Sequence, residues 1–291
     1  MITGTTLVLV LFSALIHPLW NILLKKSEDK VVFYFHIHLV FTVFFSFILF
    51  IFPVGSISVE GWIFIMLSSF AHFFYQIFLC RAYELGDISL VYPIIRSSPI
   101  FVAILGFIFL KEIPTPIALA GILLVIAGTQ LINQKALSLS AVFKPIRRDS
   151  RKMVLAAGLT ALFSALYSAV DKKGVLEVNP ILFFYLFFAF SGLFFGAYLM
   201  LYKDKRRNFL LILKKDKYRI ALASVLEFTS YVLILYAFRL SKVAYVVALR
   251  QVSVIFGAIL GVWLLNEKYA GVRIAASVII FIGVFLITVF G

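Results

Sequence analysis

The sequence predicts an all-α integral membrane protein with ten transmembrane helices, arranged as two inverted five-helix repeats. Of its 291 residues, 63% are hydrophobic, only 14% are charged and 33 are phenylalanine, which is more apolar surface than a water-soluble core could bury. Apolar runs of about 20 residues, enough to cross roughly 30 Å of hydrocarbon as a helix, recur along the chain. They are continuously apolar rather than alternating, which favours helices over a β-barrel. The expected spans are residues 4–24, 32–52, 62–84, 88–109, 115–133, 154–172, 181–202, 218–240, 243–264 and 270–290.

The basic residues orient these spans. The net charge is +14, but nearly all Lys and Arg lie between apolar runs, which places them at lipid head groups and argues against nucleic acid as a partner. The first, third, fifth, seventh and ninth connections hold 20 of the 27 basic residues, and the even connections hold five. Because cytoplasmic loops collect Lys and Arg, both termini are expected outside the cytoplasm.

The chain contains an internal repeat at an offset of 155 positions. SPIFVAILGFIFLKE (98–112) lies over SVIFGAILGVWLLNE (253–267), with nine of fifteen positions identical, and Gly128 pairs with Gly283. Since five spans are an odd number, the second copy enters the membrane from the opposite side, an arrangement typical of secondary transporters with a site at the repeat interface. The predicted domains are a first repeat over 1–133, a basic linker over 134–153 and a second repeat over 154–291.

On these residues the chain resembles the drug/metabolite transporter superfamily, and within it the EamA-like ten-helix transporters. The similarity covers essentially the whole chain and rests on the fourth and ninth segments, ending in FLKE and LLNE, each followed by an apolar helix with a late glycine. The resemblance implies a central cavity lined by the first four helices of each half, and solute export or exchange without ATP.

Three charged residues lie deep inside predicted spans. Arg96, Arg250 and Glu227 are each about 10–15 Å below the membrane surface at 1.5 Å per helical residue. Buried charges are costly, so we expect them to face the cavity or one another. Two guanidinium groups from opposite halves would prefer an anion, and Glu227 would serve as counter-ion or proton carrier. A purely structural Arg–Glu pair between the eighth and ninth helices is the alternative.

The repeat register adds further candidates. His72 occupies the position equivalent to Glu227, and Arg96 the position equivalent to Gln251. Residues one helical turn from these charged groups share a face with them. The predicted substrate-binding set is therefore completed by His72, Tyr75, Gln76, Tyr92, Tyr231 and Gln251, together with a polar stripe on the first helix, His17, Trp20 and Asn21.

The sequence favours a secondary transporter of a small anionic or zwitterionic metabolite, working by alternating access in the cytoplasmic membrane. A flippase for a lipid-linked phosphate and an integral membrane transferase are the alternatives, although no paired carboxylates or Walker-type loop are found. We expect no enzyme activity, no catalytic residue, no metal and no cofactor beyond a coupling proton or ion. The expected partners are the solute and membrane lipid, with a monomer or homodimer as the assembly.

The charge distribution makes a direct prediction about topology. A fluorescent protein that matures only in the cytoplasm, fused to Gly291, should stay dark, because the C-terminus is expected on the opposite side. A fusion within the basic linker should fluoresce. A bright C-terminal fusion would contradict the orientation.

Overall fold

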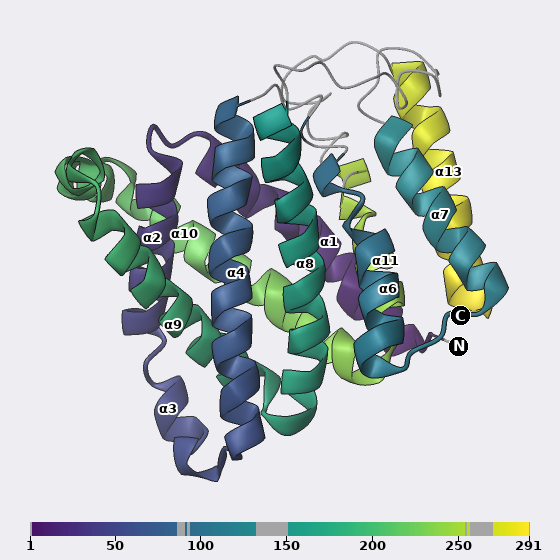
Figure 1. Ribbon diagram of the computed structural model, residues 1–291, viewed down its shortest axis with the longest axis horizontal. Helices are drawn as coiled ribbons and strands as arrows, with labels where there is room; N and C mark the ends of the chain where they lie inside the picture. Colours follow the sequence, from purple (N-terminus) through teal and green to yellow (C-terminus); the bar gives the residue numbers. More distant parts are fainter. Residues whose placement is uncertain are drawn as a thin grey trace.

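The computed structural model describes residues 2–85, 91, 94–131, 151–253, 255–256 and 270–290. Within these ranges the chain is helical, without a strand, and its two termini lie close together (Figure 1). In chain order the helices are α1 (Gly4–Lys25), α2 (Lys30–Phe44), α3 (Ile48–Ile51), the 3-10 helix η1 (Val54–Ser56), α4 (Val59–Leu85), α6 (Ser98–Leu110), α7 (Pro116–Leu131), α8 (Arg151–Glu177), α9 (Pro180–Met200), α10 (Lys203–Leu240), α11 (Val243–Arg250) and α13 (Ala270–Phe290).

The lengths and surfaces of these helices suit a bilayer. Among the described residues, five helices are long and apolar enough to cross a membrane, namely α1, α4, α8, α9 and much of α10. The shorter α2, α6, α7 and α13 are also apolar, and α11 is the described start of the ninth expected span. Large apolar side chains such as Phe50 and Phe281 are exposed on the outside of the bundle, as expected for a surface that faces lipid.

Short polar residues fix where several helices begin. The side chains of Thr3, Asp29 and Asn179 accept hydrogen bonds from backbone N–H groups in the first turns of α1, α2 and α9. These N-terminal N–H groups have no partner inside the helix, so each cap satisfies one of them. At the other end of a helix, Lys111 adopts a left-handed conformation (φ 54°) and closes α6.

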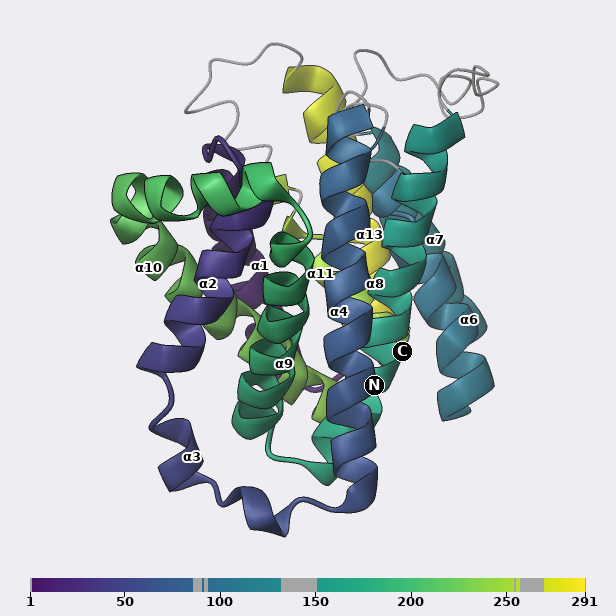
Figure 2. The same ribbon diagram turned by 60° about the vertical axis from the view of Figure 1, so that its left-hand side comes forward.

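Two spans differ from the sequence-based expectation. The second expected span, 32–52, is interrupted by a turn after Phe44, and the short α3 continues it. Helix α10 begins at Lys203, well before the expected residue 218, because Lys, Arg and Leu are good helix formers even in a polar stretch. Its first turns run across the bundle end, near the start of α2, before the helix turns into the bundle (Figure 2).

The helix packing follows the repeat. Helix α1 packs along α10 and α4 packs along α8; α2 lies against α10 and α9 against α4. The pairs α7–α13, α2–α9 and α6–α11 join equivalent helices of the two halves. Exchanging each helix for its equivalent in the other half therefore preserves the main packing pairs. This confirms the predicted all-α membrane fold of two inverted five-helix repeats.

The α7–α13 pair shows the same relation at single residues. A Cβ atom on Gly121 would lie 2.7 Å from the Gly283 carbonyl oxygen, and one on Gly128 would lie 2.9 Å from that of Ala276. In the repeat register Gly121 is equivalent to Ala276, and Gly128 to Gly283, so the two contacts are images of each other. Small residues here let the two backbones approach closely.

We predict that Gly121→Ala destabilises the protein, because the added methyl group would press against the α13 backbone. Overpacking of this kind costs about 1–3 kcal/mol. The thermal unfolding midpoint of the detergent-purified protein should fall. Gly158→Ala on α8 is the matched control, because its Cβ would meet no atom within 4 Å. Equal midpoints for both variants would refute the close α7–α13 contact.

Candidate functional site

A buried hydrogen-bonded chain joins α4 to α10 through Asp171 of α8. Asp171 is fully buried and accepts hydrogen bonds from Ser68 (2.6 Å), Tyr231 (2.5 Å) and the His72 Nε2 atom (3.1 Å). The His72 ring is stacked between Tyr167, at 4.0 Å between centroids, and a phenylalanine of α9. Both carboxylate oxygens of Asp171 are therefore occupied by donors, which come from two other helices, α4 and α10.

A second buried chain joins the same two helices through Tyr34 of α2. The Gln76 side-chain amide of α4 donates to the Tyr34 hydroxyl oxygen, and the Tyr34 hydroxyl donates to Glu227 Oε1 on α10. The remaining oxygens, Glu227 Oε2 and Gln76 Oε1, are buried and have no hydrogen-bond partner among the described residues. Buried polar atoms are rarely left unpaired, which marks this place as a candidate for ligand contact.

The two chains are related by the repeat. His72 is equivalent to Glu227, and Gln76 is equivalent to Tyr231. One chain links position 72 to position 231, and the other links position 76 to position 227, so the pseudo-two-fold axis exchanges them. Their middle groups differ, because a carboxylate of α8 stands in one chain and a phenol of α2 in the other. The site is thus symmetric in its connections and asymmetric in its chemistry.

Arg250 lies beside these chains at the end of α11. Its Nη2 atom is 3.0 Å from His17 Nδ1, and its guanidinium lies 5.2 Å from the centre of the Tyr231 ring. The Trp20 indole also reaches His17 Nδ1, at 3.3 Å. Guanidinium and indole nitrogens can only donate, so this ring nitrogen acts as an acceptor. Asn21 holds the opposite side of the ring, 3.2 Å from Nε2.

No carboxylate of the described residues forms an ion pair with Arg250, although its charge acts on Glu227. The structural Arg250–Glu227 pair considered from the sequence is therefore not formed as a direct contact. A guanidinium inside a membrane without a carboxylate partner is costly, and a bound anion would compensate it.

Arg96 and Gln251, which occupy equivalent positions of the two halves, contact each other directly. Arg96 Nη1 donates to Gln251 Oε1 at 3.1 Å, across a sequence separation of 155 residues. A contact between equivalent positions must lie on the pseudo-two-fold axis. Arg96 therefore sits at the junction between the halves, in the turn that precedes α6.

Three of the residues predicted to bind substrate remain to be placed. Tyr75 is half-buried on α4 and meets Tyr167 edge-on at 5.2 Å, on the side of the first chain. Trp20 is buried against Tyr34, rather than anchored at the membrane surface. Tyr92 lies outside the described residues. Which of the candidate residues contact a solute stays a prediction.

Sequence reasoning missed Tyr34 altogether and undervalued Asp171. Tyr34 lies in an aromatic run, and its only signal is the polar His38 one turn further on. Asp171 falls at the end of the sixth expected span, 154–172, just before Lys172 and Lys173, and is not among the substrate-binding residues predicted from the sequence. The helix continues to Glu177, however, and Lys172 donates to the Ser241 carbonyl oxygen at the end of α10.

The two halves are fastened together at the end of the bundle that holds the even connections. Glu112 accepts a hydrogen bond from the backbone N–H of Val243 at the start of α11 (2.7 Å) and lies 3.7 Å from Lys172. Lys242 donates to the Ile113 carbonyl oxygen at 2.8 Å. Glu112 thus accepts from the N-terminus of a helix that belongs to the other half. Its sequence equivalent, Glu267, lies outside the described residues.

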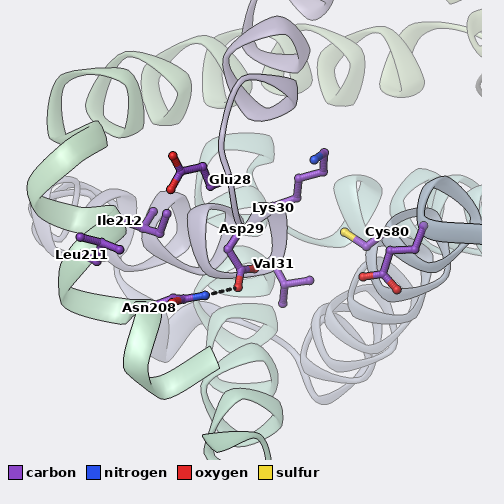
Figure 3. A pocket seen from close by; sticks show the side chains of 9 residues that line it. Glu28, Asp29, Lys30, Val31, Cys80, Asn208, Leu211 and Ile212 are labelled. Atoms are coloured by element: carbon purple, nitrogen blue, oxygen red, sulfur yellow. Dashed lines mark hydrogen bonds between the residues drawn. The ribbon is translucent and has the colours of Figure 1, made fainter. Parts of the chain in front are cut away.

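The opposite end holds a cavity of about 240 Å³ between α4 and α10. Cys80 and Glu84 of α4 line one side; Asp29 and its neighbours at the start of α2, with Asn208 and Ile212 of α10, line the rest (Figure 3). Asn208 donates to Asp29 at 3.2 Å. Asp29 and Asn208 belong to opposite halves, so the halves are joined at this end as well. A second cavity, of about 300 Å³, lies at the even-connection end and is lined by Glu112, Lys172, Lys242 and Tyr245.

An apolar helical bundle with two exchange-related halves and charged groups between them defines a multi-pass membrane transport protein. The family model for the EamA-like transporter family matches residues 4–134 and again residues 151–289. The chain belongs to this family, which is part of the drug/metabolite transporter superfamily predicted from the sequence, and whose members are transporters.

Other comparisons support the fold alone. A solved structure described only as the crystal structure of a protein matches all of both chains, with a TM-score of 0.73 and 13% identity. No curated protein sequence matches the chain.

We predict that Asp171→Asn destabilises the protein more than Glu177→Gln, the exposed control on the same helix. An amide at position 171 cannot accept from all three donors, and each buried donor left unpaired costs roughly 1–3 kcal/mol. The comparison is made by thermal unfolding in detergent. Indistinguishable midpoints would show that the first chain does not hold the helices together.

Proposed function

We propose that the protein is a secondary transporter that exports or exchanges a small anionic or zwitterionic metabolite across the cytoplasmic membrane by alternating access. The observation that carries this proposal is Arg250, a guanidinium at the end of α11, inside the bundle, whose direct partner is His17, an uncharged acceptor at Nδ1. A solute carboxylate or phosphate would give it a bidentate charged partner. Arg96, at the junction of the halves, is the second candidate ligand.

Each end of the bundle has both a contact between the halves and a cavity. Glu112, Lys172 and Lys242 join the halves beside one cavity at the even-connection end, and Asn208 joins Asp29 beside the other cavity at the opposite end. Rocking the halves about the central contacts would widen one end while it closes the other. The pseudo-two-fold relation of the two halves is what such a motion requires.

The assignment is tested with the purified protein and a panel of small carboxylates, phosphates, zwitterions and cations. Binding to the native state raises the unfolding midpoint by mass action. An anion or zwitterion should stabilise the wild type, and Arg250→Ala should weaken its binding by about tenfold or more. Hydrogen bonds to charged groups contribute roughly 1.5–3 kcal/mol, and 1.4 kcal/mol corresponds to a factor of ten.

Arg81→Ala is the control for this experiment, because Arg81 is exposed and pairs with Glu84 three residues away. It should bind the same solute as the wild type does. Arg96→Ala, run beside it, separates a solute ligand from a residue that only joins the halves. Stabilisation by cations alone, or binding that Arg250→Ala leaves intact, would contradict the proposed site.

A further inference from the structure

The first turns of α10 lie on the surface of the bundle end rather than inside the bundle. They run across that end, where Asn208 donates to Asp29 of α2 and Lys215 pairs with Glu28 (Figure 2). Tyr202, directly before the helix, is exposed. Tyrosine is enriched where a membrane meets water. This part of α10 therefore lies at the level of the lipid head groups.

Burial divides this part of α10 into two faces. Ile212, Asp216 and Ile220, spaced four residues apart, are buried against the bundle. Residues three and four apart share one face of a helix, so the side chains between them belong to the other face. On that outer face, basic and apolar side chains are interspersed and exposed, namely Arg207, Leu210, Leu211, Lys214, Lys217 and Tyr218.

The outer face carries an excess of positive charge. Its neighbours Lys215 and Arg219 each pair with a carboxylate. Arg207, Lys214 and Lys217 form no ion pair with any carboxylate in the part of the chain that the structure describes. Such a surface attracts an anionic partner and repels a second copy of itself.

The apolar side chains between these cations distinguish a lipid from a dissolved anion. Leu210 is 61% exposed and Tyr218 is 80% exposed. A free phosphate would leave both in water, whereas a phospholipid brings acyl chains together with its phosphate. Interfacial helices bind membranes by this combination of apolar contact and attraction to anionic head groups. An anionic phospholipid therefore matches both kinds of side chain.

We propose that residues 207–219 of α10 form a binding surface for anionic phospholipids. The head-group phosphates bind the three cations without a carboxylate partner, and the acyl chains lie against Leu210 and Leu211. This surface is separate from the charged groups between the halves, so the inference does not depend on which solute the protein carries.

The surface also forms one wall of the cavity at this end. Leu211 and Ile212 line that cavity, and Asn208 beside them donates to Asp29 (Figure 3). A lipid on the outer face adds contacts to a segment that joins α10 of the second half to α2 of the first. Lipid that binds the native bundle therefore raises its unfolding midpoint by mass action.

Binding is tested by titrating the detergent-purified protein with dioleoyl phosphatidylglycerol or with dioleoyl phosphatidylcholine and following the thermal unfolding midpoint. Phosphatidylglycerol should stabilise the protein at lower concentration than phosphatidylcholine does. A triple variant, Arg207→Gln with Lys214→Gln and Lys217→Gln, should weaken phosphatidylglycerol binding about tenfold or more, because each basic residue near an anionic membrane surface contributes about fivefold.

The matched control removes three exposed cations from the other end of the bundle, Lys111→Gln with Lys173→Gln and Arg239→Gln. It should respond to phosphatidylglycerol as the wild type does. A charge-preserving triple variant, Arg207→Lys with Lys214→Arg and Lys217→Arg, should also keep the response.

Glycerol 3-phosphate, a phosphate without acyl chains, separates lipid from a dissolved anion and should leave the midpoint unchanged. Equal stabilisation by the two lipids, an equal response of the two glutamine triple variants, or stabilisation by glycerol 3-phosphate as large as that by phosphatidylglycerol would overturn the proposal.

Discussion

The bundle depends on one constraint: a polar group inside a bilayer can find its hydrogen-bond partners only within the protein. The chains through Asp171 and Tyr34 meet that constraint by tying α4 of the first half to α10 of the second. The surrounding contacts are mainly aromatic and aliphatic, and the α7–α13 pair adds close backbone contact at glycines. Any motion of one half against the other must exchange the directional contacts that these chains make between the halves.

The repeat supplies two equivalent chains, and the side chains make them unequal. The Asp171 chain is saturated with donors and suits a fixed connection, because every atom of the carboxylate is already satisfied. The Tyr34 chain ends in Glu227, whose Oε2 atom has no hydrogen-bond partner in the part of the chain that the structure describes. A fixed link and a responsive link at equivalent positions would let solute binding alter one connection between the halves while the other keeps their register.

Much of this arrangement could be read from the sequence, and the remainder has physical reasons for staying hidden. Span positions follow from hydrophobicity over helical lengths, and the offset of 155 residues pairs His72 with Glu227 and Arg96 with Gln251. Tyr34 could not be found because phenols are common in aromatic runs and its partners come from two other helices. Asp171 looked like a span end because Lys172 follows, and only the structure shows that lysine reaching the carbonyl groups of α10. Which oxygen of Glu227 is open depends on side-chain directions that no sequence pattern records.

The central claim is that a site between the halves is reached alternately from the two sides of the membrane. Ser253, one turn beyond Arg250, is buried, and its hydroxyl has no partner among the described residues. Ser253→Cys in a Cys80→Ser background would place a single small thiol there. The decisive measurement is the rate at which membrane-impermeant thiol reagents of small size label it from each face of oriented vesicles. The account predicts labelling from both faces, with a bound solute slowing both rates; labelling from one face alone, whatever the solute, would contradict alternating access.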